Sequence, residues 1–75
     1  MRAKERDKPK QVTFHLDGLL ESNGLTLTEL ANRVDITLVN LSVLKNNRAK
    51  AIRFSTLEAL CDVLDCQPGD LMTYE

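Results

Sequence analysis

The chain has 75 residues and a formal net charge of −1, with no Trp, one Tyr and two Phe. A chain of this length folds as one small domain, hides only roughly 60% of the surface of its unfolded form, and leaves little room for a deep active-site cleft. No apolar run approaches the ~20 residues of a membrane-spanning helix, and no apolar stretch follows the basic N-terminus as in a signal peptide. We therefore expect a cytoplasmic domain with an aliphatic core and no membrane association.

The charges are segregated along the chain. Residues 1–10 contain five basic and two acidic side chains, and residues 45–53 contain four basic and no acidic ones. Residues 54–75 contain five acidic and no basic side chains. Segregation of this kind is typical of a surface with one anionic partner, such as nucleic acid. The alternative is that each run of charge is simply a solvated loop.

Residues 1–11 have alternating charges, one Pro and almost no apolar side chain. They predict a flexible basic arm, either a solubilising tail or a segment that lies on a DNA backbone or in its minor groove. The predicted domain covers residues 12–75 and begins with a strand-like segment at 12–14, followed by a helix from about 15 to 23. We predict that the lone His15 lies on the surface.

The most regular stretch, residues 26–46, predicts two short helices joined by a tight turn. Thr26 and Glu29 have the spacing of a capping box, in which each side chain bonds the backbone N–H of the other residue. Asp35 interrupts the apolar run that follows. The apolar side of this helix is predicted to consist of Leu27, Leu30, Ala31 and Val34.

The second helix of this stretch has its own start and stop signals. Thr37 is a suitable N-cap, and Asn46-Asn47 can supply the left-handed residue that commonly ends a helix. Leu38, Leu41 and Leu44 follow Thr37 at a spacing of three. Two helices of about two turns each are not stable alone, so they must pack on each other and on a further element. That arrangement is a helix-turn-helix.

The C-terminal third predicts a longer helix and a final helical turn. Ser55 and Glu58 have the spacing of a second capping box, which predicts that the longer helix begins after Ser55. Pro68 is well placed to begin the final turn. Residues 73–75 can then pair with residues 12–14 as a two-stranded ribbon. The buried stripe of the longer helix is predicted to be Leu57, Leu60, Cys61 and Leu64.

With these elements in order, the chain resembles the Cro/repressor-type helix-turn-helix family, often called Xre-like, over about residues 16–72. It is most similar to a small stand-alone bacterial subgroup. The resemblance implies an all-α fold, a compact five-helix lambda-repressor-like domain, with a short terminal β-ribbon as an optional addition. It also implies that helix 38–46 lies in the DNA major groove and that loop 46–53 lies on phosphates. The segments that carry the resemblance are GLTLTELANRVDITLVNLSVLKNN and RAKAIRFSTLEALCDVLDCQPGDL.

The family pattern also implies which side chains contact DNA. Base contacts are expected on the outward face of the third helix, at Thr37, Leu38, Val39, Asn40, Ser42 and Val43. Phosphate contacts are expected at Thr28, Asn46, Arg48, Lys50 and Arg53. The chemistry agrees, because cations neutralise phosphates, an Asn amide can pair with adenine, and aliphatic side chains can touch thymine methyl groups.

The chain departs from the family pattern at four points. A frequent Gln at the start of the second helix is replaced by Leu27 or Thr28. A frequent ion pair between the first helix and the end of the third would fall at Leu20 and Lys45, so we expect it to be absent. A usual loop Gly is Asn47. The reading face of the third helix is unusually apolar, which suggests contact with another molecule.

These features predict a sequence-specific, repressor-like transcriptional regulator that binds double-stranded DNA as a homodimer on a two-fold-related site. The dimer contact is expected either at Leu71, Met72 and Tyr74 or through strand pairing at residues 12–15. The alternative function is a protein-interaction module or an antitoxin-like adaptor. No small-molecule ligand is expected.

An enzyme is the least favoured class of protein. The sequence shows no nucleophile–base pair, no Gly-rich phosphate loop and no metal cluster, so we expect no catalytic residues, no metal and no cofactor. Two thiols and a distant His do not make a zinc site. Cys61 and Cys66 are therefore predicted to be reduced, packed thiols.

Overall fold

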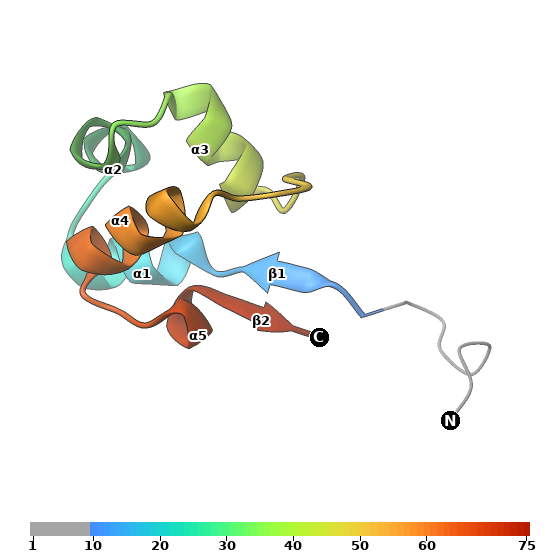
Figure 1. Ribbon diagram of the computed structural model, residues 1–75. Helices are drawn as coiled ribbons and strands as arrows, with labels where there is room; N and C mark the ends of the chain where they lie inside the picture. The colour runs from blue at the N-terminus through green and yellow to red at the C-terminus, as the bar shows by residue number, and fades with distance from the viewer. Residues whose placement is uncertain (1–9) are drawn as a thin grey trace, which may run out of the picture.

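The computed structural model describes residues 10–75, which form five helices and a two-stranded ribbon. The predicted basic arm lies outside the described residues, apart from its last two positions. In Figure 1, α2 and α3 lie at one end of the helical body and α5 at the other, with α1 and α4 between them. The elements are β1 (Val12–Phe14), α1 (Leu16–Asn23), α2 (Leu27–Val34), α3 (Leu38–Lys45), α4 (Phe54–Leu64), α5 (Pro68–Leu71) and β2 (Met72–Tyr74).

The two central helices begin at the predicted caps. The Glu29 backbone N–H donates to Thr26 Oγ1 at 3.1 Å, and the Thr26 N–H donates to Glu29 Oε1 at 2.8 Å. The bond from the Thr26 backbone N–H to the Glu29 carboxylate is the main cause that holds the pKa of Glu29 below its usual range, and the Thr26 hydroxyl adds to it. Thr37 accepts from the Asn40 N–H at 3.1 Å and so caps α3. Between the helices, Asp35 adopts a left-handed φ of 55°, which turns the chain sharply.

The predicted start of α4 is wrong. The helix begins at Phe54, with Arg53 as its N-cap, and no side chain caps it. The Leu57 N–H donates to the Arg53 carbonyl at 3.0 Å, so the first helical bond forms before Ser55 is reached. Ser55 and Glu58 have the spacing of a capping box, but the helical turn that buries Leu57 already includes both residues. Local spacing predicted the helix correctly and its first residue incorrectly.

The core is aliphatic and joins all five helices. Leu30 of α2, Leu41 of α3, Leu60 of α4 and Leu71 of α5 are completely buried, and Leu16 of α1 is 1% exposed. Among the described residues, no polar or charged side chain is buried with them. The α4 helix contacts α1, α2 and α5, so it is the element on which the shorter helices pack.

The two ends of the described chain form the optional ribbon, which extends away from the helices (Figure 1). Strands β1 and β2 are antiparallel, with Val12 opposite Tyr74 and Phe14 opposite Met72. The second strand begins one residue earlier than predicted, because Met72 is already extended when α5 ends at Leu71. The predicted dimer contact at Leu71 is therefore wrong, since this side chain is fully buried in its own core.

An ion pair joins α1 to the end of α3, where the sequence predicted none. Lys45 Nζ lies 3.4 Å from Asp17 Oδ1. The family pattern placed the partner of Lys45 at Leu20, which is buried in the core. The acidic partner, Asp17, lies about one turn earlier on the same helix. The Asp17 side chain is largely exposed, so the pair contributes at most about 1 kcal/mol.

Candidate nucleic-acid interface

The α3 helix has one buried side and one exposed side, and apolar residues lie on both sides. Leu41 and Leu44 face the core, so the opposite side of the helix faces solvent. Leu38 is 46% exposed and Val39 is 72% exposed, although both are large and apolar. Two exposed aliphatic side chains in succession on a short, capped helix leave a surface that is ready to be covered by another molecule.

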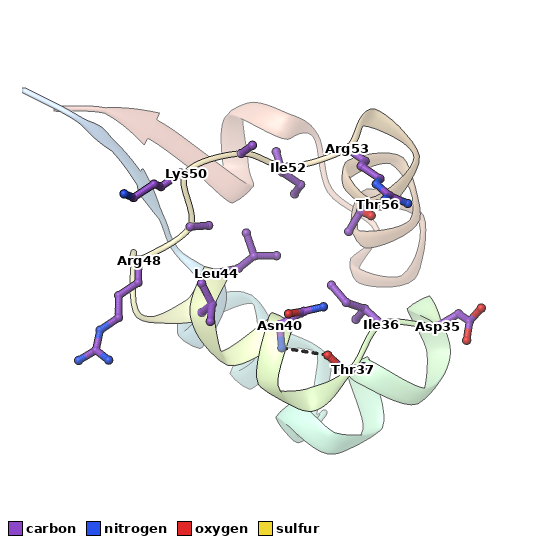
Figure 2. Close-up of a pocket in the computed structure, with 13 residues that line it drawn as sticks. Asp35, Ile36, Thr37, Asn40, Leu44, Arg48, Lys50, Ile52, Arg53 and Thr56 are labelled. Carbon is purple, nitrogen blue, oxygen red and sulfur yellow. Dashed lines mark hydrogen bonds between the residues drawn. The ribbon is translucent and has the colours of Figure 1, made fainter.

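An open groove of about 520 Å³ runs between α3, the loop that follows it and the first turn of α4 (Figure 2). Three predicted base-contact residues line it, namely Thr37, Asn40 and Val43. Three predicted phosphate-contact residues also line it, namely Arg48, Lys50 and Arg53. The structure thus brings six of the eleven predicted site residues together from positions up to 16 apart in the sequence.

The electrostatics of the groove favour an anion. None of the three groove cations forms an ion pair with a residue of the described part of the chain, where the pairs are His15–Glu75 and Lys45–Asp17. Asp35 belongs to the groove lining, but its carboxylate points away from the groove in Figure 2, where Arg48 and Lys50 also project outward from the rim. The groove and its rim therefore present positive charge that residues 10–75 do not neutralise.

The remaining predicted residues lie outside the groove. Leu38 and Val39 are on the exposed side of α3, and Thr28 is exposed on α2. Ser42 is half-buried, and the Asn46 amide donates to the Ser42 carbonyl at 3.0 Å. Asn46 thus has a local role at the end of α3: its amide also donates to the Ser42 hydroxyl at 3.2 Å, in addition to the bond from its backbone N–H to the Ser42 carbonyl at 2.9 Å.

Sequence reasoning missed the contribution of α4 to the groove. Thr56, in the first turn of α4, lines the groove next to Arg53, which is the N-cap residue, and no side chain caps this end of the helix. Free N–H groups and the positive end of the helix dipole favour an anion at this place. Because the sequence predicted a cap at Ser55, it gave no signal that this helix end is open.

A capped two-helix unit, an outward-facing second helix and an adjoining cationic groove define a helix-turn-helix domain built for nucleic acid. The sequence matches the model of the Cro/C1-type HTH DNA-binding domain over residues 15–75. The chain belongs to this family, and the expected five-helix fold is confirmed.

Two known proteins extend this assignment. An uncharacterized HTH-type transcriptional regulator of Bacillus subtilis (strain 168), YozG, is 52% identical over 63 residues, which cover 84% of this chain and 75% of YozG. The crystal structure of the transcriptional regulator VanUg superposes with a TM-score of 0.74, covering 91% of this chain and 89% of VanUg. Its sequence identity is 23%, so this second likeness concerns the fold.

None of the described helices has the length and apolar character needed to cross a membrane.

Proposed function

We propose that the protein is a sequence-specific, repressor-like transcriptional regulator that binds double-stranded DNA in the bacterial cytoplasm. The observation that carries this proposal is the shared groove, whose lining includes Thr37 and Asn40 of α3 together with three cations that pair with no acid among residues 10–75. Membership of a DNA-binding family and the regulator relatives support it. Its activity is binding rather than catalysis.

In this proposal α3 enters the major groove and reads bases. The Asn40 amide can donate to and accept from an adenine edge, and Leu38 and Val39 can touch thymine methyl groups. Ser42 and Val43 are half-buried, so only part of each side chain is available to contact a base. The Thr37 hydroxyl accepts from the Asn40 N–H, which leaves its own hydrogen free for a phosphate or a base. We expect an operator whose half-sites are rich in A·T pairs.

The phosphate contacts supply affinity and register. Arg48, Lys50 and Arg53 each neutralise a phosphate, and the open N-terminus of α4 offers N–H groups to one of them. Thr28 and Asn46 are the proposed flanking contacts, since both are exposed near the ends of α2 and α3. Contacts of this kind hold the domain on the duplex without reading the sequence.

We also propose that the protein acts as a homodimer on a two-fold-related site. One recognition helix contacts too few base pairs for useful specificity, so two copies one helical turn apart are needed. With Leu71 excluded, the exposed residues of the ribbon are the better candidates for the contact. Val12 is 55% exposed and Tyr74 is 66% exposed, and they lie opposite each other.

A second candidate function is a protein-interaction module, such as an antitoxin-like adaptor. The observation that favours it is the number of exposed large apolar side chains near the groove. Phe54, at the start of α4, is 79% exposed, in addition to Leu38 and Val39. A partner that covers Leu38 and Val39 would compete with DNA for the exposed side of α3.

Selection of bound sites from a random oligonucleotide pool, at one stated salt concentration, tests the proposal. We expect enrichment of a two-fold-related sequence with half-sites about 10 bp apart, and loss of this preference in Asn40→Ala. Enrichment of no sequence, together with capture of one protein partner that Val39→Asp abolishes, would instead establish the interaction module.

A further inference from the structure

Asn47 stands between the end of α3 and the cationic loop. Its backbone has a φ of 60°, the left-handed conformation that Gly adopts most readily and Asn less so. The Asn47 N–H donates to the Leu44 carbonyl at 3.1 Å, and the Arg48 N–H donates to the Val43 carbonyl at 2.9 Å. These bonds satisfy the last carbonyls of α3. Gly would make the same bonds, so the helix ending alone does not explain the Asn.

The side chain of Asn47 makes a bond that Gly cannot make. Its Oδ1 accepts the backbone N–H of Phe14, which is distant in sequence, at 2.6 Å. Gln11 exchanges backbone bonds with Glu75, and the His15 N–H bonds the Leu71 carbonyl, so the N–H groups of alternate residues face β2. The N–H of Phe14 therefore lies on the outer edge of β1, where Asn47 supplies its acceptor.

Little else holds the ribbon to the loop. An apolar hollow of about 280 Å³ separates them, lined by Val12, Phe14 and Met72 on one side and by Ala49, Ala51 and Ile52 on the other. Phe14, Met72, Ala49 and Ile52 pack against the core, but the hollow keeps the ribbon and the loop from packing fully against each other. Among the hydrogen bonds of residues 10–75, the Asn47–Phe14 bond is the one that joins the ribbon to the loop.

We propose that Asn47 is a positioning residue for DNA binding. By tying the edge of β1 to the start of the loop, its amide holds Arg48 and Lys50 in the arrangement that successive phosphates require. A loop that is already ordered loses less conformational entropy when it binds DNA than a loop that must first be ordered. This role rests on the proposed DNA-binding function, because the side chains that Asn47 positions are the proposed phosphate contacts of the loop.

Asn47→Gly isolates this role, because Gly keeps the left-handed backbone and removes only the amide. Loss of the hydrogen bond lowers stability, while relief of the left-handed strain raises it, so the urea midpoint should change little. The dissociation constant for the selected duplex should rise about 2- to 10-fold, which is the range expected for one hydrogen bond. The slope of log Kd against log salt should also become shallower, since a mobile loop engages fewer phosphates.

Asp65 provides the matched control. It has a φ of 51° at the end of α4 and is not part of the groove. Asp65→Asn and Asp65→Gly differ from each other by an amide side chain, as Asn47 differs from Asn47→Gly, and the two variants carry the same charge. Their affinities for the duplex should therefore be equal. Amide hydrogen exchange by NMR, without DNA, reports the bond directly. The Phe14 amide should exchange faster in Asn47→Gly and stay protected in Asn47→Asp, which keeps an acceptor oxygen.

The results separate this proposal from the function beneath it. Weaker binding by Asn47→Gly, with equal affinities for the Asp65 pair and faster exchange at Phe14, supports the positioning role. If Asn47→Gly binds as tightly as the unmodified protein, the positioning role is wrong and the DNA-binding function stands. If the unmodified protein binds no duplex from the selection, both proposals fall together.

Discussion

The two ends of α4 carry hollows of similar size and opposite charge. The groove at its N-terminal end has a volume of about 520 Å³ and is lined by three cations that form no ion pair within residues 10–75. A hollow of about 440 Å³ at its C-terminal end is lined by four carboxylates and two thiols: Glu58, Asp62, Asp65, Asp70, Cys61 and Cys66. Shape alone would not distinguish them. Their charge does distinguish them, because a phosphate backbone is attracted to the first hollow and repelled by the second. In the proposed function this difference orients the domain on DNA.

Removing the core beneath α4 would break this comparison most severely, because both hollows depend on that helix. Leu60 is completely buried between its two ends. We expect Leu60→Ala to lower the free energy of unfolding by about 2–5 kcal/mol, through lost burial and the cavity that remains. Urea unfolding followed by circular dichroism measures it. Asp62→Ala on the exposed side of the same helix serves as the control and should change stability by less than about 0.5 kcal/mol.

Removing the three cations of the groove should abolish the preference of DNA for the N-terminal end of α4 over its C-terminal end. The triple variant Arg48→Ala, Lys50→Ala, Arg53→Ala removes the three proposed phosphate contacts. We expect a loss of about 100-fold in affinity at 0.15 M salt and a salt slope reduced by about 3. Fluorescence anisotropy over a salt series measures both. The reverse change at the other end, Asp62→Asn with Asp65→Asn, should strengthen binding only slightly, and an equal effect from the two ends would refute the assigned orientation.

Removing the cap of α3 changes the helix that lines one side of the groove and leaves the groove cations in place. It therefore tests the contribution of shape separately from that of charge. Thr37→Ala loses the bond to the Asn40 N–H. We expect a loss of about 1 kcal/mol in stability, and weaker DNA binding with an unchanged salt slope. Thr37→Ser keeps the hydroxyl and should restore both quantities. A Thr37→Ser variant as unstable as Thr37→Ala would show that the cap bond does not hold α3.

The smallest effect concerns the thiols of the acidic hollow. Burial, followed by the neighbouring Cys61, raises the pKa of Cys66. A pKa raised by folding favours the neutral thiol, so this contribution to stability is present below the unfolded pKa and is lost as pH rises through the folded value. In Cys61→Ser, burial remains as the main cause, so the pH midpoint of Cys66 alkylation should stay above the ordinary value of about 8.5. The same midpoint in folded and urea-unfolded protein would contradict this account.

The sequence predicted what is local and missed what depends on tertiary contacts. The caps of α2 and α3 follow from spacings of three residues, and the structure places them as predicted. The start of α4 was misplaced because the burial of Leu57 sets it, not the nearby Ser55. The ion pair of Lys45 was missed because the family position of its partner is occupied by a core leucine, while Asp17 lies one turn away.

The site was predictable in its residue types but not in its assembly. Charge segregation and the family pattern indicated the loop cations, and the structure gathers three of them beside α3. Whether Thr28 and Asn46 join them could not be read from spacing, because the path of the loop is set by contacts with α4 and the ribbon. The bond from Asn47 to Phe14 depends on the same path, so no local pattern could have indicated it.

One measurement tests the orientation on DNA most directly. Amide chemical shifts of the protein, recorded by NMR during titration with the selected duplex, report which surface the DNA covers. We predict the largest changes in α3, in residues 46–53 and in the first turn of α4, with little change from Asp62 to Asp70. Changes concentrated at the acidic end of α4, or an undisturbed α3, would contradict the account.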